Sequence, residues 1–476
     1  MGCCQSQEVT PSGGEKYAVS TNPHDARNTP QQAAAADESA AVSPAPTPSP
    51  VPASRTPEAV VSATTVAQRN AGQSLRCNSE TALLFPGHRH FPTILHEGWL
   101  SKHLTKQMYD QLWRAGATRG GWNIDRAIQC ALDYAVLDGT PTSGVGVLMG
   151  DAESYTLLMP LLRPIVKEFH GFDMGRDSHH VEVDSSRVRV ANPDPEGDYI
   201  KSVRVRGGRQ VMNMSFTTCA SRAERRETER LLVEACGKLG VPGSYETRAG
   251  MDPERLVALR DVKGLMFDDP DLWTVLSGSG RDWPDARGVW VSDDEQVAVW
   301  VNEEDHMRCI VSHPGSSVHA AFTQWCGMVN GIESHLDSGY AVRPGIGALT
   351  PCPSQLGSGG FQVSVRVRLP LLGEKEWLKG YCREMGVRCR GHIKKRVGTG
   401  GVDSGGVGEE GAAGVDGSGG DREDLRYTGL FILSNIGCLG EGAASLVDRV
   451  LTCVSSLIGL ERRLAGGEDV SRPELP

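Results

Sequence analysis

The sequence predicts an α+β protein with a small helical N-terminal domain and a larger domain whose antiparallel sheet is flanked by helices. Apolar residues recur at helical spacing before residue 180, and β-prone alternating runs begin only near residue 199. Proline is enriched in residues 1–85 and glycine in residues 398–420, two segments that cannot build a core. We therefore expect a disordered tether over residues 1–85, a helical domain over 86–182 and a larger domain over 198–465.

Composition and charge exclude several classes of protein. The 476 residues include 49 Lys and Arg against 59 Asp and Glu, a formal net charge of −10. Nucleic-acid binding needs a clustered positive surface, so we expect no nucleic-acid partner. No run of about 18 apolar residues is present to span a bilayer. The 13 cysteines include no Cys-x-x-Cys pair, which favours a reducing compartment such as the cytoplasm.

The tail begins with a pattern typical of lipidated proteins, Met-Gly-Cys-Cys-Gln-Ser. Removal of Met1 would leave Gly2 as the amine for N-myristoylation, with Ser6 in the position that this modification favours. Cys3 and Cys4 are adjacent candidates for palmitoylation. Two or three acyl chains anchor a protein stably where one does not, so the pattern predicts a membrane tether, with a flagellar membrane as one candidate. A chance start is the alternative.

Helices are expected first, in the segment before residue 180. Thr105 precedes Met108 and Leu112 at helical spacing, and the pattern continues beyond them. Pro164 falls inside a second stripe and is expected to kink that helix. The first stripe continues with Ile124, Ile128 and Ala131, and the second comprises Tyr155, Leu158, Leu162, Ile165 and Phe169.

Strands follow in the larger domain, where β-prone residues alternate or run together. Helices are expected among and after the strands, at 220–237 and 443–464. Residues 398–420 are mostly glycine with small and acidic residues, and they are expected to form a long loop. The expected strands include residues 203–206, 289–291, 297–301 and 363–369.

A pair of arginines alternates in the run Ser202-Val-Arg-Val-Arg206. On a strand, Arg204 and Arg206 would lie side by side on one face. Two guanidinium groups held in this way can chelate several phosphate oxygens. A solvated strand face is the alternative interpretation of so short a pattern.

Three adjacent carboxylates, Glu303, Glu304 and Asp305, follow an apolar run and precede His306 and Arg308. Carboxylates this close repel one another unless cations lie nearby. The cluster could therefore hold a cationic substrate or order the waters of a phosphate-bound Mg²⁺. An exposed acidic turn is the alternative.

Two further segments could present chemistry to a ligand. Cys352 lies between two prolines before a glycine-rich turn, and donors close to its sulfur would stabilise a thiolate; a buried inert thiol is the alternative. The loop at 143–151 contains Val145 and Gly146, and its glycines suit a close backbone approach to a ligand or any ordinary loop. The sequence has neither a GxxxxGK[ST] loop nor the motifs of a protein kinase.

Together these motifs resemble the phosphagen (guanidino) kinase family, over residues 86–465 apart from the glycine-rich insert. The family's paired arginines are matched at 202–209, its NEEDH motif with a following arginine at 302–308, and its reactive-cysteine motif at Cys352-Pro-Ser. Residues 281–288 resemble the creatine-kinase branch in particular, as do the two loops that contain Val145 and Val402.

The resemblance implies reversible transfer of the γ-phosphoryl group of MgATP to a guanidino compound, for energy buffering. Glu304 would bind the guanidinium and take its proton, and Cys352 as a thiolate would balance its charge. Val145, Gly146 and Val402 would line the substrate site, and no metal would be bound directly by the protein. The implied ATP-binding residues are Ser202, Val203, Arg204, Val205, Arg206, Arg308, Arg396, Val397, Gly398, Thr399, Gly400 and Gly401.

Four positions depart from the family pattern, and all four concern nucleotide binding. Val291 and Arg366 stand where the family has histidine, Gln362 where it has a phosphate-binding arginine, and Ile432 where it has an acidic residue. Arg366 is a candidate substitute for the charge that Gln362 lacks, provided that the two share a face with the phosphates.

Creatine is the first expected substrate, and taurocyamine or arginine is the second. The alternative is a pseudo-enzyme, a membrane-tethered scaffold whose nucleotide site has degraded. The sequence leaves open whether Arg390 or Arg396 is the last phosphate-binding arginine. It also leaves open whether the protein is a monomer or a homodimer.

Overall fold

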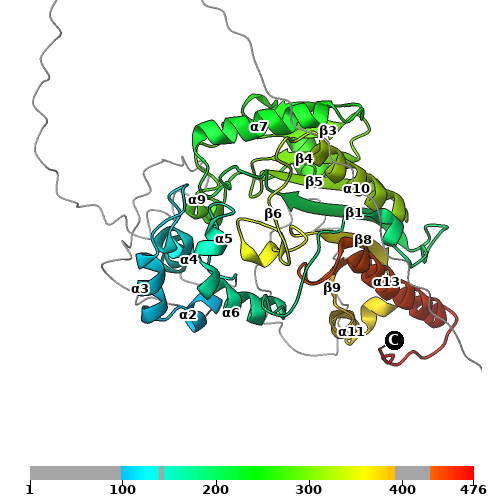
Figure 1. Cartoon of the computed structure of the whole chain (residues 1–476). Coiled ribbons are helices and arrows are strands. Elements are labelled where there is room, and N and C mark those ends of the chain that lie inside the picture. The colour runs from blue at the N-terminus through cyan, green and yellow to red at the C-terminus, as the bar shows by residue number, and fades with distance from the viewer. Residues whose placement is uncertain (1–97, 139–143, 392–428, 476) are drawn as a thin grey trace, which may run out of the picture. The chain divides into compact units, whose positions relative to one another are not determined.

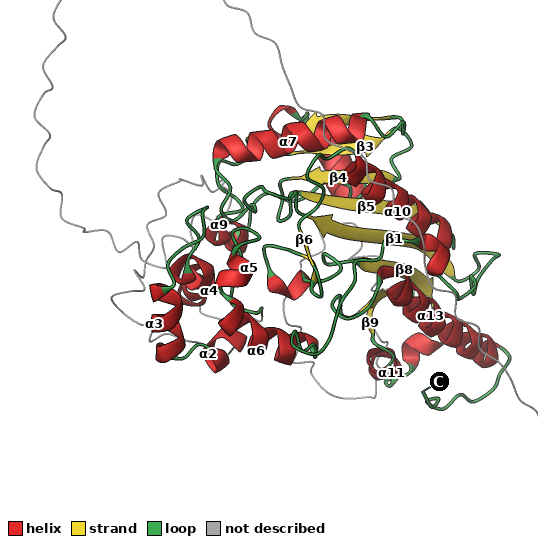
Figure 2. Cartoon of the chain, in the orientation of Figure 1, coloured by secondary structure: helices red, strands yellow, loops and turns green. Residues whose placement is uncertain are grey.

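A computed structural model describes residues 98–138, 144–391 and 429–475. The predicted tether, its lipidation residues Gly2, Cys3 and Cys4, and the glycine-rich insert lie outside the described residues. The described part contains a group of small helices and a large antiparallel sheet flanked by longer helices (Figures 1 and 2). This arrangement confirms the predicted α+β fold class.

The first described helices form where the sequence has its helical stripes. The hydroxyl of Thr105 accepts a hydrogen bond of 3.2 Å from the backbone N–H of Met108, and so caps the helix that follows. The second stripe is divided at Leu158, and the later helix continues through Pro164. The break lies just before Pro160, which occupies the first helical turn, where a missing N–H is tolerated. These helices are α2 (Trp99–His103), α3 (Lys106–Arg114), α4 (Ile124–Asp138), α5 (Ser154–Leu157) and α6 (Met159–His170).

The main sheet has eight strands in the order β2-β3-β4-β5-β1-β8-β10-β9, and every neighbouring pair is antiparallel. A separate pair, β6 (Val342–Arg343) and β7 (Gly347–Ala348), precedes the Cys352 segment. The strands of the main sheet are β1 (Ile200–Arg209), β2 (Gly243–Thr247), β3 (Gly288–Ser292), β4 (Val297–Val301), β5 (Met307–Pro314), β8 (Gln362–Arg368), β9 (Val387–Arg390) and β10 (Leu430–Asn435).

Helices connect and cover the strands. Ser221 and Glu224 form a reciprocal capping box at the start of α7, which fixes where that helix begins. The longer helices are α7 (Arg222–Gly237), α10 (Val318–Ser334) and α13 (Ala443–Ala465), and the shorter ones are α8 (Pro253–Val257), α9 (Leu272–Ser277) and α11 (Leu378–Glu384). Single turns are η1 (Ser185–Arg187), η2 (Arg248–Gly250), η3 (Ala258–Val262), η4 (Pro353–Gln355) and η5 (Leu372–Glu374).

The two faces of the sheet differ in character because side chains alternate along each strand. On β1, Val203 and Val205 are buried and pack in a core shared with α10 and α13. Arg204 and Arg206 point to the opposite side and are half-buried. We call this opposite side the arginine face. On β1 the fold thus separates an apolar, helix-covered face from a face that carries two arginines.

Helix α13 is the one helix among the described residues that is long and apolar enough to cross a membrane, by length and composition alone. Asp448 and Arg449 interrupt its apolar residues, so it is not an unbroken apolar run of about 18 residues, and the chain was expected to have no such run. Its apolar side chains, including Leu446, Val450 and Val454, are buried in the core against β8 and β10. A core helix that is covered on several sides passes the same test of length and hydropathy.

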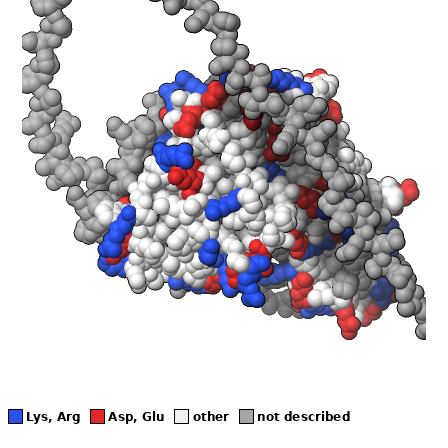
Figure 3. All heavy atoms as spheres, in the orientation of Figure 1, with Lys and Arg blue, Asp and Glu red and all other residues white. Residues whose placement is uncertain are grey.

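Charged side chains are mixed on the face of the molecule that Figure 3 shows. Lys and Arg lie close to Asp and Glu at several places, and the surface between them is mostly uncharged, with a few isolated basic groups. Several of the ion pairs join neighbouring turns of one helix, such as Arg230 with Glu227 and Glu234 on α7. Exposed pairs of this kind contribute little to stability individually.

Candidate active site

The turn between β4 and β5 carries the carboxylate motif, and two of its residues shape it. Asn302 has a left-handed backbone (φ 57°), and its side-chain amide donates to the carbonyls of Arg225 and Ala286 at 2.8 and 2.9 Å. His306 is fully buried; its Nδ1 accepts from the N–H of Val211, so its Nε2 donates to the carbonyl of Ser215. Burial lowers the pKa of His306 to about 4, which keeps the ring neutral.

The carboxylates of this turn converge on Arg308. Its Nη2 lies 2.6 Å from Asp305 Oδ2 and 3.3 Å from Glu304 Oε2, and its Nε lies 4.0 Å from Glu303 Oε2. Burial raises the pKa of Glu303, and it raises the pKa of Asp305 to about 7. Burial alone would lower the pKa of Arg308, but the carboxylates raise it above its ordinary value. The nearby cation that the three acidic residues require is therefore supplied within the motif itself.

Gln355 joins the carboxylate turn to the cysteine segment. Its Nε2 donates to Glu304 Oε2 at 2.9 Å, and its Oε1 accepts from Arg308 Nη2 at 3.0 Å. A neutral amide suits this place because it has one donor and one acceptor group to offer the two charges. Gln355 was not among the site residues predicted from the sequence. Its position directly after the Cys-Pro-Ser motif is the signal that could have indicated it.

Cys352 lies in the same neighbourhood and is buried, with 8% of its surface exposed. Its Sγ is 3.0 Å from the hydroxyl of Ser354. Burial raises the pKa of the thiol to about 11, and the charge of Glu304 adds to this shift while the Ser354 hydroxyl opposes it. Without a bound cation, Cys352 is therefore a thiol at neutral pH. The hydroxyl that the sequence analysis expected beside the sulfur is present.

The loop that contains Val145 and Gly146 is attached to the cysteine segment. Val145 is buried in an apolar cluster that also includes Cys352 and Leu356. The N–H of Met149, four residues further on, donates to the carbonyl of Pro351 at 2.7 Å. The fold thus brings this predicted substrate loop, from the helical N-terminal part, next to the predicted reactive cysteine.

Gly146 shows why a glycine is needed in this loop. Its backbone is left-handed (φ +74°), and a Cβ atom built on it would lie 2.8 Å from Cβ of Leu100. A larger residue would be strained and would push the loop away from α2.

Arg204 is held in place on the arginine face. Its Nε donates to the hydroxyl of Ser312 on β5 at 3.1 Å. Its Nη2 donates to the carbonyls of Lys263 and Gly264, at 3.1 and 2.9 Å. These contacts fix the orientation of one edge of the guanidinium group. Arg206 lies two residues along the same strand, opposite Ile310 of β5.

Only alternate residues of the predicted run 202–206 present their side chains on the arginine face. Ser202 joins Arg204 and Arg206 there, with the half-buried exposure that the three share. The side chains of Val203 and Val205 lie in the core on the other side of the sheet. The predicted residues Arg396, Val397, Gly398, Thr399, Gly400, Gly401 and Val402 lie outside the described residues.

The sheet register locates the four departures from the family pattern. Val291 is buried in an apolar cluster with Ala298 and Ile310, beside the arginine face. Gln362 on β8 is directly opposite Arg206. The remaining positions fall into one row of cross-strand partners, in which Ser202 faces Arg366, Arg366 faces Ile432, and Ile432 faces Arg390.

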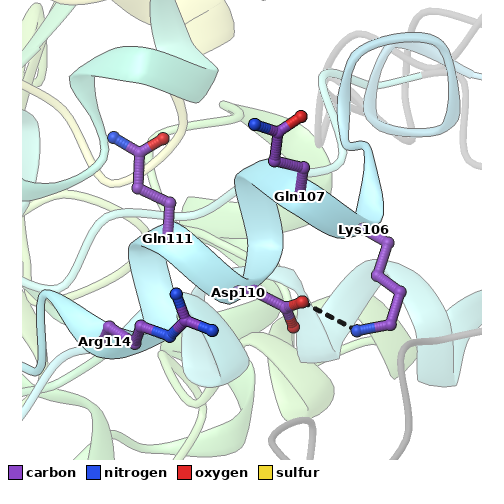
Figure 4. Close-up of a pocket in the computed structure, with 5 residues that line it drawn as sticks. All are labelled: Lys106, Gln107, Asp110, Gln111 and Arg114. Atoms are coloured by element: carbon purple, nitrogen blue, oxygen red, sulfur yellow. Dashed lines mark hydrogen bonds and ion pairs between the residues drawn. The ribbon is translucent and has the colours of Figure 1, made fainter.

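Two further features of the described residues concern metal binding and surface hollows. Within residues 98–138, 144–391 and 429–475, no three His, Cys, Asp or Glu side chains come together as a metal-binding group. A surface depression of about 440 Å³ runs along α3, and none of the residues that line it is a predicted site residue (Figure 4). All of its lining comes from one helix, and Lys106 and Asp110 pair within it at 2.7 Å. We assign no role to this depression. It is lined by Lys106, Gln107, Asp110, Gln111 and Arg114.

Comparisons with known proteins agree with the geometry of this site. Residues 95–167 match the family model of the ATP:guanido phosphotransferase N-terminal domain, and residues 228–401 match that of the C-terminal catalytic domain. The chain is 33% identical over 384 residues to the creatine kinase B-type of Gallus gallus, which covers 79% of this chain and 92% of that protein.

Two solved structures resemble the fold. A lombricine kinase is 28% identical with a TM-score of 0.67, covering 80% of this chain and 97% of that one. A duplicated taurocyamine kinase from Schistosoma mansoni is 22% identical with a TM-score of 0.63, covering 78% of this chain and 48% of that one. The second likeness concerns the fold alone. With both domain models matched and a relative covered over nearly its whole length, the chain belongs to the phosphagen kinase family and is an ATP:guanidino phosphotransferase.

Proposed function

We propose that creatine is the preferred phosphoryl acceptor of this enzyme, followed by taurocyamine or arginine, and that MgATP is the donor. The observation that carries the proposal is the junction of Glu304, Arg308 and Gln355 beside Cys352. It combines an oriented carboxylate for a guanidinium with a cation for a phosphoryl group. The 33% identity to a creatine kinase supports creatine as the first choice.

Glu304 would activate the acceptor nitrogen. A guanidinium is a poor nucleophile because its pKa is above 12. When the acceptor nitrogen attacks the γ-phosphorus, the N–P bond forms, the bond to the β-γ bridging oxygen breaks, and the nitrogen's proton passes to the Glu304 carboxylate. Glu304 is the least buried acid of the turn, with 31% of its side chain exposed, so it can reach a ligand.

The arginines would stabilise charge on the transferred group. The phosphoryl group passes through a metaphosphate-like transition state, so catalysis depends on alignment and neutralisation more than on covalent chemistry. Arg308 adjoins Glu304 directly. Arg206 and Arg204 continue from it along the arginine face. In our proposal these three hold the phosphates of MgATP, and the Mg²⁺ arrives with the nucleotide.

Cys352 would respond to the acceptor's charge. Its thiol is protonated in the substrate-free protein because burial raises its pKa. A guanidinium placed beside the sulfur would favour the thiolate and be stabilised by it in turn. Val145, in the same apolar cluster, would limit the size of the acceptor.

A coupled assay of ADP formation tests the acceptor. Purified full-length chain would be assayed with MgATP and creatine, taurocyamine, arginine, glycocyamine or lombricine as acceptor. We expect the highest kcat/KM with creatine. A higher kcat/KM for any other acceptor would refute the choice of creatine. The absence of turnover with all five acceptors would contradict the assignment of phosphotransferase activity. The comparisons give no support to the alternative of an inactive scaffold.

We also propose that the N-terminal tail anchors the enzyme to a cytoplasmic membrane surface. The support is the sequence Met-Gly-Cys-Cys-Gln-Ser, which offers one myristoylation and two palmitoylation sites. Gly2→Ala should move the protein from the membrane fraction to the soluble fraction, and Cys3→Ser with Cys4→Ser should weaken the association. A Gly2→Ala variant that stays fully in the membrane fraction would disprove the lipid anchor. A flagellar location and the choice between monomer and homodimer stay predictions.

A further inference from the structure

Gln210 is a buried polar residue directly after the end of β1, and its side chain contacts the carboxylate turn. None of its surface is exposed. Its Nε2 donates to Oδ1 of Asp305 at 2.7 Å, and its Oε1 accepts from the backbone N–H of His306 at 3.2 Å. A backbone N–H can only donate, so the amide oxygen must face His306 and the NH₂ group must face Asp305. One side chain thus contacts both the backbone of the turn and one of its charges.

The carboxylate of Asp305 lies in a closed socket, and each of its oxygens has its own donor. Asp305 is 1% exposed. Gln210 donates to its Oδ1, and Arg308 Nη2 donates to its Oδ2 at 2.6 Å. Gly208 leaves room for the carboxylate, because an added Cβ atom there would overlap Oδ2. Hydrogen bonds to the ionised form of a carboxyl group favour that form, so the amide opposes the effect of burial on Asp305.

The charge of Asp305 matters for Glu304 because the two share Arg308. Nη2 of Arg308 lies 2.6 Å from Asp305 Oδ2 and 3.3 Å from Glu304 Oε2. An ionised Asp305 is therefore the closer partner of the guanidinium group. A protonated Asp305 would release Arg308 towards Glu304, and a tighter ion pair would make Glu304 a weaker proton acceptor.

The other ionisable groups around Asp305 do not supply what Gln210 supplies. Burial raises the pKa of Cys352 to about 11, also raises the pKa of Tyr155, and lowers the pKa of His306 to about 4, so all three are uncharged at neutral pH. Substitution of Gln210 removes none of the charged groups. The charged groups that act on Asp305 are Arg209 from β1, Arg308 from β5, and Glu303 and Glu304 from the turn itself.

We propose that Gln210 is a positioning residue of this enzyme, whose amide keeps the Asp305 carboxylate ionised and paired with Arg308. Glu304 is thereby left free to take the proton of the acceptor. The inference rests on the proposed function, in which Glu304 is that proton acceptor. It predicts that Gln210 acts on the reaction through the titration of Asp305, and not only through the shape of the turn.

The pH dependence of turnover tests this role in Gln210→Met, which keeps the length of the side chain and removes the donor. We expect the acidic limb of kcat to move upward by about one pH unit or more, because a hydrogen bond to a charged group is lost. At pH 9, kcat should stay close to that of the unsubstituted chain. A merely structural role would instead lower kcat by the same factor at every pH. Full-length chain would be assayed with MgATP and the preferred acceptor from pH 6 to pH 9.

Unfolding in urea gives a second readout that needs no activity. Burial raises the pKa of Asp305 from an ordinary value of 3.8 to about 7, so the stability of the folded protein falls as the pH rises towards and through 7. Gln210→Met should raise this pKa further, so the stability of the variant keeps falling up to a higher pH. The difference in free energy of unfolding between the two chains should therefore widen from pH 6 to pH 9.

Gln107→Met, on exposed α3, is the matched control and should change neither measurement. An unshifted acidic limb, or a stability difference that is the same at every pH, would overturn the proposal. Should Gln210→Met fail to fold, Gln210→Asn decides by the same two measurements, with a smaller upward shift expected because the shorter side chain holds the amide away from Asp305. If no acceptor were turned over, the proposed function would fail, and the stability measurement would still decide whether Gln210 controls the charge of Asp305.

Discussion

At the scale of single residues, the carboxylate turn divides its tasks between shape and charge. Asn302 and His306 make buried hydrogen bonds that fix the backbone, and neither carries charge. Glu304 and Asp305 carry the negative charge, and Arg308 balances it. Because the shape is set by neutral groups, the carboxylates can respond to a ligand without disturbing the turn.

The Glu304→Gln substitution tests the proposed proton acceptor. The amide can keep the hydrogen bond that Glu304 Oε2 makes with Gln355 or Arg308, but it cannot take a proton at neutral pH. We expect kcat to fall by about 10² to 10⁴ and the KM for MgATP to change little. Steady-state kinetics with the preferred acceptor would measure both. Exposed Glu196→Gln is the matched control, and a kcat for Glu304→Gln equal to the control's would contradict the assignment.

The Gln355→Leu substitution tests the bridge between the carboxylate and the cysteine segment. Leucine has nearly the same volume but offers no hydrogen bond to Glu304 Oε2 or Arg308 Nη2. A hydrogen bond to a charged group contributes about 1.5–3 kcal/mol, so we expect kcat/KM to fall roughly tenfold or more. Gln355→Asn, which keeps the amide on a shorter side chain, should recover part of the loss. Equal kinetics for the Leu and Asn variants would mean that the amide does not position the site.

The sequence indicated the charged groups of the site but not the contact that connects them. Glu304, Arg308 and Cys352 stand in short motifs whose residue types suit the chemistry. The bond from Gln355 to Glu304 spans 51 residues, and such a contact depends on how β4, β5 and the cysteine segment pack. An amide side chain is also common in any loop, so its residue type alone carries little information.

At the scale of elements, strands with strong β-propensity were predicted well from the sequence. Which strands pair with one another in the sheet was not predicted. The run 297–301 is β4 with the expected limits. Helix α10 was not among the expected elements, because apolar residues surround most of it and Gly327 and Gly331 interrupt its pattern. The alternation of β8 places Arg366 and Gln362 on one face, but only the pairing of β8 with β1 shows that Arg204 shares it.

A loop element holds Arg204, and Gly264→Ala tests its importance. Gly264 has φ +61°, and an added Cβ atom would lie 2.7 Å from Nη2 of Arg204. Alanine would therefore be strained and would push the guanidinium from its place. We expect the KM for MgATP to rise several-fold and stability to fall by about 1–2 kcal/mol. Both would be measured, by kinetics and by urea unfolding.

Gly327→Ala is the control for this substitution. Gly327 lies within α10, and an added Cβ atom would meet nothing within 4 Å. Alanine in a helix interior is preferred over glycine by roughly 0.5–1 kcal/mol, so this variant should be as stable as the unsubstituted chain or more so. A normal KM for MgATP in Gly264→Ala would show that the loop does not position Arg204.

At the scale of the whole molecule, the site lies where separate parts of the chain meet. The apolar cluster that surrounds Cys352 includes residues from α2 to α6, from the 145–149 loop, from the 341–356 segment and from single positions such as Phe216 and Leu439. Local patterns predicted these pieces as separate features. Their union depends on long-range packing, which no spacing within the sequence specifies.

His179 lies at one such meeting point and links stability to pH. It is 3% exposed, and its Nδ1 accepts from the N–H of Gly440 at 3.0 Å. Burial lowers the pKa of His179 to about 4, with smaller effects from the charges of His180 and Arg209. An unfolded chain binds a proton at this residue near pH 6.5, whereas the folded protein does so only near pH 4. Its contribution to stability is therefore present above pH 6.5 and lost as the pH falls towards 4.

His179→Asn tests this linkage, because its Oδ1 can accept the same hydrogen bond but the side chain does not titrate. The free energy of unfolding would be measured in urea between pH 7 and pH 4 for both chains. We expect the stability advantage of the unsubstituted chain to shrink by about 3 kcal/mol over that range. Exposed His335→Asn is the control for the loss of a histidine side chain elsewhere on the protein. A His179→Asn curve that runs parallel to that of the unsubstituted chain would show that His179 has the same pKa in the folded and unfolded states. The buried neutral ring would then not be a source of acid sensitivity.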